Sequence, residues 1–319
     1  MQATLTELER GAVRVTMPLP WALDHVHCYV LPDSSGATIV DCGLGSRATT
    51  VWWKDALARL GRPRVRRIVV THYHPDHVGA GAALVELTGA AEVVQGALDA
   101  RLSAQAWGDE ADDDGFTAYL RQHGMPAELA ARSTEAEAAT PVFPAQPTRL
   151  VDEGDTVEIG GEPFCVLVLP GHADGHIALL GAQSGRLFSA DVLLEEITPN
   201  VGRWPDTRPD PLGAYLHTLD RLDGLDVATV FPGHGPVIRE HRRRTAEIRA
   251  HHAERLDAHE HALRSGAASA YDVATVVWQA DGLGFHEQRF ALVEAISHLE
   301  RLEALGRARR SGWGGWRAV

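Results

Sequence analysis

The feature that most constrains this chain is a cluster of metal-binding residue types directly after a short apolar run. His72, His74, Asp76 and His77 fall within six residues, immediately after Ile68-Val69-Val70. A short apolar run of this kind is typical of a buried strand, so the cluster is expected at a strand's carboxyl end. Residues two apart in an extended chain point to the same side, so His72 and His74 can bind one ion. Asp76 and His77 lie beyond the turn and can bind a second.

Later segments repeat this placement of a histidine after a strand. His172 follows the apolar run 164–169, and His234 follows the run 227–231. A single histidine is more often a core or surface group than a ligand. Repeated placement at strand ends favours convergence on one metal site.

Four motifs resemble those of the metallo-β-lactamase fold hydrolases. They cover most of residues 10–240 and read His72-x-His74-x-Asp76-His77, Pro170-Gly171-His172-Ala173-Asp174-Gly175-His176, Ser189-Ala190-Asp191 and Phe231-Pro232-Gly233-His234-Gly235. The resemblance implies an α/β fold, the αββα sandwich, with one or two metal ions at one edge of the paired sheets. It leaves the substrate open, because the family hydrolyses lactams, thioesters, lactones and phosphodiesters.

The resemblance also implies which residues bind the metals. The first ion would be held by His72, His74 and His172, and the second by Asp76, His77 and His234, with Asp191 bridging the two. Because this set contains no thiolate, two zinc ions fit it best, with iron or manganese as alternatives. Such ions lower the pKa of bound water, so no serine or cysteine nucleophile is needed. Asp76 would additionally orient that water or shuttle its proton, as the catalytic carboxylate.

Two further residues take supporting roles by the same resemblance. Asp41 would not bind a metal ion itself. It would form a hydrogen bond with a ligand imidazole and so fix the tautomer of that ring. His176 lies outside the usual ligand set and is expected to support the site from behind. Trp21, in an apolar loop, is expected either to contact substrate or to pack on the core.

Bulk composition narrows the choice of partners. The chain has 319 residues and a formal net charge of −13, which disfavours nucleic acid and anionic membranes as partners. No apolar run approaches the ~20 residues that cross a bilayer, so we expect a cytoplasmic protein with no membrane contact. The three cysteines, Cys28, Cys42 and Cys165, lie in apolar strand-like sequence and are expected to be buried free thiols.

Two segments are expected outside the sandwich. An alanine-rich helical insertion at about 97–140 predicts a lid over the substrate pocket, with a flap that makes no substrate contact as the alternative. Residues 1–240 then form the catalytic domain, and residues 241–319 a helical appendage. The appendage resembles the winged-helix-like one carried by a branch of the family, and Trp313 would lie in its wing or in a frayed tail. Four histidines are expected on a solvated helix face, namely His251, His252, His259 and His261.

These observations leave three hypotheses for function. The first is a metal-dependent hydrolase of a small ester-like molecule, a thioester or lactone, with a homodimer as the assembly considered. The second is a phosphodiesterase or endoribonuclease acting on single-stranded RNA, with a phosphate track formed by Arg242, Arg243, Arg244, Arg307, Arg309 and Arg310. The third is a di-iron redox module with a flavin partner. The third is disfavoured because no flavodoxin-like region follows the metal-binding segment.

Overall fold

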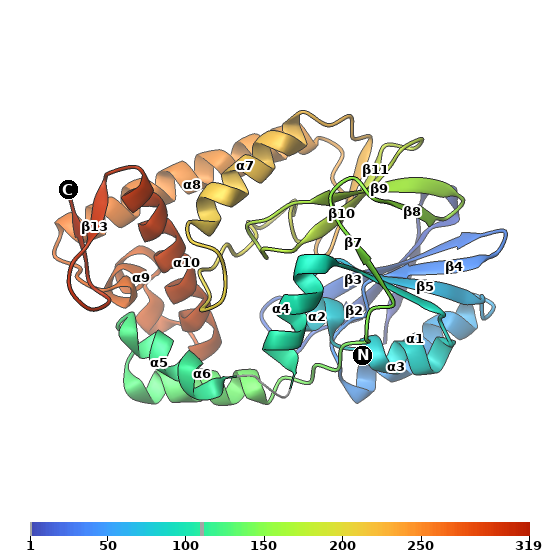
Figure 1. Ribbon diagram of the computed structural model, residues 1–319, viewed down its shortest axis with the longest axis horizontal. Helices are drawn as coiled ribbons and strands as arrows, with labels where there is room; N and C mark the ends of the chain where they lie inside the picture. Colours follow the sequence, from blue (N-terminus) through green and yellow to red (C-terminus); the bar gives the residue numbers. More distant parts are fainter. Residues whose placement is uncertain (1, 109–111) are drawn as a thin grey trace.

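Two β-sheets face each other at the centre of the protein (Figure 1). The computed structural model describes residues 2–108 and 112–319. One sheet has the strand order β1-β2-β3-β4-β5-β6-β7 and the other the order β12-β11-β10-β9-β8. The strands of the first are β1 Thr4–Glu7, β2 Val13–Pro18, β3 His25–Asp33, β4 Gly36–Val40, β5 Val65–Val70, β6 Glu92–Gly96 and β7 Arg149–Val151. Those of the second are β8 Thr156–Ile159, β9 Glu162–Val168, β10 Ile177–Gly181, β11 Arg186–Ala190 and β12 Thr229–Pro232.

Aromatic side chains fill the space between the sheets. Tyr29 of the first sheet meets Phe188 of the second edge to face, with ring centroids 5.0 Å apart. Phe188 stacks on Phe231 at 5.1 Å. Val69 and Val94 join the same buried cluster, so apolar burial holds the two sheets face to face.

Helices cover the outer faces of both sheets and complete an αββα sandwich, as the family resemblance predicted. Trp53 of α1 (Arg47–Arg59) and Leu84 of α3 (Gly81–Thr88) are buried in one cluster with residues of the first sheet. Tyr215 and Leu219 of α7 (Pro211–Asp223) belong to a cluster with residues of the second sheet. In the part of the chain that the structure describes, no helix has the length and apolarity needed to cross a membrane.

The predicted insertion is helical and lies beside the carboxyl-terminal helices (Figure 1). Its helices are α4 Ala97–Trp107, α5 Asp113–Gln122 and α6 Ala127–Ala138. The carboxyl-terminal segment contains α8 His241–Arg264, α9 Ala270–Trp278 and α10 Phe285–Ala304, followed by a hairpin of β13 Ala308–Arg310 and β14 Trp316–Ala318. Glu137 of α6 and Arg289 of α10 form an ion pair, so the two segments are directly joined.

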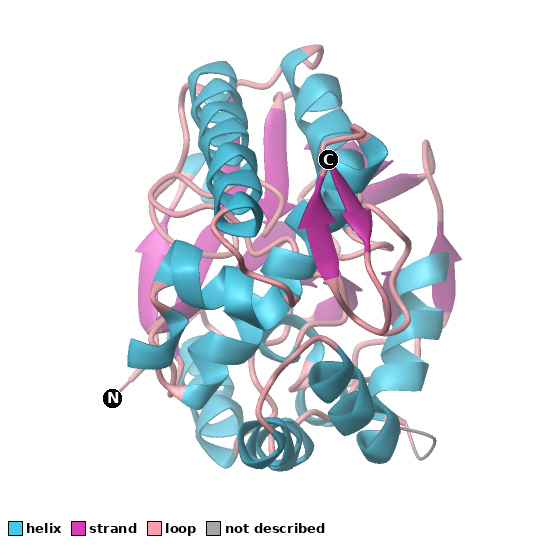
Figure 2. Ribbon diagram, turned by 90° about the vertical axis from the view of Figure 1, so that its left-hand side faces the viewer, coloured by secondary structure: helices cyan, strands magenta, loops and turns pink. Residues whose placement is uncertain are grey.

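The carboxyl-terminal residues form an ordered hairpin rather than a frayed tail (Figure 2). Trp313 lies in the loop of that hairpin and is 85% exposed. The helices expected after residue 240 are present, while their division into a separate appendage and its likeness to a winged helix stay predictions.

The prediction that four histidines decorate a solvated face of α8 was wrong for two of them. His252 and His259 are fully buried, because helical periodicity places them on the stripe that faces α10. The imidazole ring of His259 stacks on that of His298 in α10, with centroids 4.6 Å apart. His251 is half-buried and His261 is exposed.

The strand directions bring the polar loops to one edge of the sandwich. β4 and β5 are parallel, and so are β11 and β12, so the carboxyl ends of each pair lie at the same edge. Asp41 follows β4 and His72 follows β5 in the first sheet. Asp191 and His234 follow β11 and β12 in the second sheet.

Candidate metal centre

The local chain path explains how the His72 motif turns its side chains inward. After β5 the chain makes a single helical turn, α2 (Pro75–Val78), with Pro75 at its first position. A proline there fixes φ without costing a hydrogen bond. The turn buries Asp76 and His77, and the main chain of His77 is tied to the end of β4 by a 2.7 Å hydrogen bond from Cys42 N to its carbonyl oxygen.

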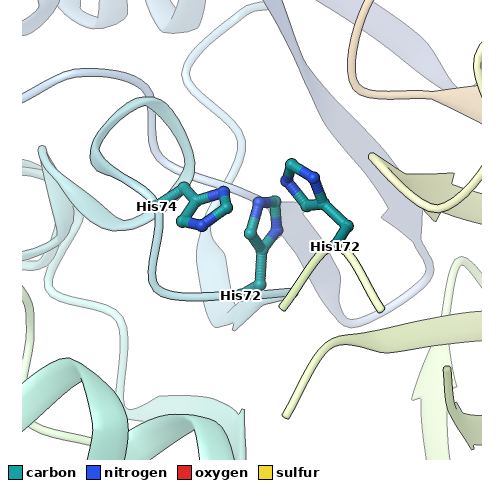
Figure 3. Close-up of side chains that lie close together, drawn as sticks. All are labelled: His72, His74 and His172. Carbon is teal, nitrogen blue, oxygen red and sulfur yellow. The ribbon is translucent and has the colours of Figure 1, made fainter. Parts of the chain in front are cut away.

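Three histidines form a first group at this edge. His72, His74 and His172 each offer a ligand atom, and these atoms lie within 4.8 Å of one another. Their rings converge from two separate loops (Figure 3). Three donor atoms grouped in this way are candidates for one ion, to which imidazole nitrogens bind at about 2 Å.

A second group shares the same edge. Asp76, His77 and His234 bring ligand atoms within 4.8 Å of one another, and so do His72, His77 and Asp191. Together with His172 and His74 these residues are the seven that the sequence predicted as ligands, and the structure brings all seven together. We call these seven residues the metal-site cluster.

Asp191 lies between the two groups. Its Oδ2 is 3.5 Å from His172 Nε2 and 3.2 Å from His234 Nε2, and its Oδ1 is 3.4 Å from His77 Nε2. One carboxylate therefore faces a histidine of the first group and two histidines of the second. This is the position that a bridging ligand requires.

The buried donor atoms of the metal-site cluster fit a metal ion. Among the seven residues of the cluster, the Nε2 atoms of His72, His77, His172 and His234 and the Oδ1 atom of Asp191 are buried without a hydrogen-bond partner. A buried polar atom left unpaired costs about 1–3 kcal/mol. Five such atoms aimed at one space indicate a cation that coordinates them.

The outer nitrogens of the same rings are held by the protein. His77 Nδ1 lies 2.9 Å from Asp41 Oδ2, so the expected contact of Asp41 with a ligand imidazole is present. His234 Nδ1 lies 2.6 Å from the carbonyl oxygen of His25, and His172 Nδ1 lies 2.8 Å from that of Asn200. A proton held on Nδ1 leaves the lone pair of Nε2 free for a metal.

Sequence reasoning missed His25 and Asn200 because each acts through its main-chain carbonyl. A carbonyl group is present at every position, so it leaves no signal in the residue type.

The charges of the site also favour a cation. Burial lowers the pKa of His72 well below its ordinary value and that of His74 to about 3. Burial also opposes protonation of His77 and His234, but nearby carboxylates, above all Asp191, outweigh it. They raise the pKa of His77 well above its ordinary value and that of His234 to about 10. Bound metal ions would balance the negative charge of the same carboxylates in place of the protons on His77 and His234.

The last glycine motif leaves room for this close packing. A Cβ atom on Gly233 would lie 2.2 Å from Asp191 Oδ1 and 2.8 Å from His77 Cε1. Only a residue without a side chain fits there. His176, the expected supporting group, is buried and stacks on His72 with centroids 4.6 Å apart.

A cavity of about 1050 Å³ opens onto the metal-site cluster. His74, Asp76, His172 and Asp191 lie in its wall, so they are reachable from the cavity. The rest of the wall is largely apolar and comes mainly from the Trp21 loop, from α4 and α5 of the insertion, from residues 194–207 and from α10. Trp21 lies in this wall and also packs against a core cluster, so the expected packing is present, while its contact with substrate stays a prediction.

The paired sheets, the outer helices and the histidine–aspartate cluster at one edge define a class of metal-binding hydrolase fold. The family profile described as "Metallo-beta-lactamase superfamily" matches residues 21–234. This match spans more than half of the chain, and the chain belongs to that superfamily. It is therefore a metallo-hydrolase.

Named relatives agree with this class. The chain is 30% identical over 241 residues to "Probable metallo-hydrolase YqjP" of Bacillus subtilis, an alignment covering 71% of this chain and 72% of the relative. It is 30% identical over 210 residues to a "Hydroxyacylglutathione hydrolase" of a Synechococcus strain, covering 65% of this chain and 62% of the relative. It is 22% identical over 239 residues to "Atrochrysone carboxyl ACP thioesterase AgnL7" of Paecilomyces divaricatus, covering 73% and 59%.

Solved structures resemble nearly the whole chain. A metallo-beta-lactamase family protein from Thermus thermophilus has a TM-score of 0.85 and 32% identity, covering 97% of this chain and 99% of that one. A beta-lactamase domain protein from Burkholderia ambifaria has a TM-score of 0.86 and 28% identity, covering 99% and 94%. The likeness therefore extends through the helical insertion and the carboxyl-terminal helices.

Proposed function

We propose that this protein hydrolyses a thioester with an apolar acyl group, using two divalent metal ions held by the metal-site cluster. The observation that carries the proposal is the set of five buried, unpartnered donor atoms at the end of the large cavity. His72, His74 and His172 would hold one ion. Asp76, His77 and His234 would hold the other, with Asp191 between them.

The donor set favours zinc. The three candidate groups contain imidazole and carboxylate donors and no cysteine, and Cys28, Cys42 and Cys165 are free thiols. Imidazole with carboxylate suits Zn²⁺ well, with iron or manganese as the alternatives. Bound metal ions would supply a nucleophile at neutral pH and polarise the oxygen of the scissile bond.

The protein's own residues would orient the substrate and move the proton. Asp76 lines the cavity beside the metal-site cluster, and its Oδ2 lies 3.4 Å from His234 Nε2. A carboxylate in this position can accept a proton from the attacking water at its cavity side and pass it to the departing thiolate. Asp41, His25 and Asn200 keep three imidazoles in the tautomer that presents Nε2.

The cavity supports an apolar acyl group. Trp107 of α4 and Phe116 and Tyr119 of α5 lie in its wall, so the insertion contributes to the pocket as a substrate lid would. A site of this size and lining suits a mostly apolar ligand positioned by a few polar groups. Two relatives are named for acylglutathione hydrolysis and for an acyl-carrier thioesterase, which supports a thioester among the ester-like substrates.

The alternative of RNA loses its structural support at the expected phosphate track. Arg243 and Arg244 pair with Glu247, and Arg242 donates to the carbonyl oxygens of Asp223 and Leu225. Arg307 pairs with Asp257 and Glu260, and Arg310 with Glu300. The four arginines that pair with carboxylates present less positive potential to a phosphate backbone than unpaired arginines would.

A substrate screen tests the proposal. Protein with quantified zinc is assayed against an aromatic acyl thioester, a lactone, a β-lactam and bis-nitrophenyl phosphate. We expect the highest kcat/KM for the thioester, its loss on chelation and its return when zinc is restored. Preferred turnover of the phosphodiester, or thioesterase activity that survives full chelation, would overturn the proposal.

A further inference from the structure

A short chain of hydrogen bonds joins helix α10 to a residue of the metal-site cluster. His172 Nδ1 lies 2.8 Å from the main-chain oxygen of Asn200. The side-chain amide of Asn200 donates a 2.9 Å hydrogen bond to Glu294 Oε2. Glu294 lies in α10, far along the sequence from His172, so a carboxyl-terminal residue is two contacts away from a candidate ligand.

The segment that carries Asn200 depends on α10 for its position. Residues 195–207 form no helix or strand, so their path is set by contacts to neighbouring elements. Arg203 N donates a 2.9 Å hydrogen bond to Val293 O of α10, and Tyr119 of α5 donates a 2.6 Å bond to Arg203 O. A Cβ atom on Gly202 would lie 2.8 Å from Val293 Cγ2, so this segment is packed tightly on the helix.

A glutamate at position 294 is unusual for a buried residue whose role is packing alone. Its surroundings are buried enough that burial raises the pKa of its carboxyl to about 7, although the bond from Asn200 and the charge of Arg255 oppose the rise. A carboxyl group placed there costs free energy that an apolar side chain would not. Among the described residues, the hydrogen bond of this carboxyl goes to Asn200.

We propose that Glu294 is a positioning residue for His172. Glu294 accepts a hydrogen bond from the side-chain amide of Asn200 and thereby fixes the position of that residue. The main-chain carbonyl of Asn200 in turn accepts the proton of His172 Nδ1. That contact sets the tautomer and ring angle, so Nε2 of His172 faces the metal-site cluster. The appended helices thereby form part of the metal centre. This inference rests on the proposed function in one respect, that His172 binds a metal ion.

The test measures metal binding rather than turnover alone. Zinc stoichiometry and stepwise affinity are determined by competition with a chromophoric chelator for wild type, Glu294→Ala and Glu294→Gln. Loss of a group that supports a metal ligand typically weakens affinity about 10–100-fold. We expect a loss in that range for one of the two ions in Glu294→Ala and an unchanged affinity for the other. Glu294→Gln keeps a carbonyl acceptor for Asn200 and should recover most of the affinity.

Two controls separate positioning from a general loss of stability. Leu299→Ala, on the same helix and fully buried, should lower the thermal midpoint of the metal-free protein without weakening either ion. The double variant His172→Ala/Glu294→Ala should lose no more affinity than His172→Ala alone, because both changes act through one ligand.

The outcomes also separate this inference from the proposed function. Two ions bound at wild-type affinity in Glu294→Ala, with chelator-sensitive turnover in wild type, would overturn the inference alone. Equal weakening of both ions in Glu294→Ala and Leu299→Ala would overturn it as well. A wild-type protein that binds no zinc would overturn the proposed function first.

Discussion

The indole nitrogen of Trp107 lies 2.7 Å from the main-chain oxygen of Tyr73, to which it donates a hydrogen bond. Tyr73 stands between the candidate ligands His72 and His74, and Trp107 ends the first helix of the insertion. Helix α4 is therefore fastened to the loop that carries two imidazoles. Both residues also line the cavity, so the bond joins the cavity wall to the loop of the candidate metal centre.

Replacing Trp107 by Phe tests that coupling. The change keeps an aromatic ring but leaves the Tyr73 carbonyl without its donor, a loss of about 1 kcal/mol. We expect kcat/KM for the preferred thioester to fall about fivefold with zinc content unchanged, because that free energy corresponds to a factor of this order in rate. Trp21→Phe, at another position in the cavity wall, is the matched control for loss of an indole. Equal effects of the two changes would show that only ring size matters.

Alanine at His72, His74, His172 or Asp191 should abolish turnover while leaving most secondary structure intact. Each change removes a donor from the centre, and we expect kcat/KM to fall by at least about 10³-fold, in line with the loss of metal-ion catalysis. Circular dichroism and elemental analysis check each variant. If all four variants unfold and the metal-free wild type unfolds with them, the ions are structural instead.

The sequence was sufficient for the fold and the candidate ligands because their signals are local. Strand periodicity locates the ends of β5, β9, β11 and β12, and residue type does the rest. Imidazole and carboxylate groups directly after a buried strand indicate metal binding or catalysis. The family resemblance then fixed how the sheets pair, which spacing alone does not.

What the sequence could not supply depends on contacts between distant elements. The burial of His252 required the packing of α8 against α10, and a histidine-rich, arginine-rich helix gives no sign of which face is inward. The contact of Asn200 with His172 uses a main-chain oxygen, and that of Glu294 depends on where the carboxyl-terminal helix lies. Tertiary packing decides such roles, so residue type is silent on them.

The buried histidines between α8 and α10 predict loss of stability in mild acid. Burial lowers the pKa of His252 to about 2 and that of His298 to about 4, whereas both titrate near about 6.5 in the unfolded chain. Below that pH the unfolded state therefore binds more protons, so stability falls as pH falls. Between pH values of about 6.5 and about 4 each residue contributes a slope of about 1.4 kcal/mol per pH unit.

Urea unfolding of the chelator-treated protein at pH values of about 7 and about 5 measures this slope without metal release. Arg255 and His251 face the same buried rings, and their positive charges act in the same direction. His298→Gln should reduce the difference in unfolding free energy between the two pH values by up to about 2 kcal/mol. An unchanged difference in that variant would show that other groups govern the acid sensitivity.

Two glycines of one turn should respond to alanine in opposite ways. Gly233 packs against Asp191 Oδ1 and His77 Cε1, where a new Cβ would lie 2.2 Å and 2.8 Å away. Gly235 has a φ of +75°, and its Cβ would meet nothing closer than Glu196 Oε2 at 3.8 Å. Gly233→Ala must push Asp191 out of its position between the two ligand groups, so we expect loss of zinc binding and of turnover. Gly235→Ala should instead cost about 1 kcal/mol of stability through its strained φ and keep most of the zinc.

Elemental analysis and urea unfolding of the two variants side by side distinguish a steric block at the centre from backbone strain beside it. Full zinc occupancy in Gly233→Ala would mean that Asp191 can move without losing a ligand, and that it does not bridge.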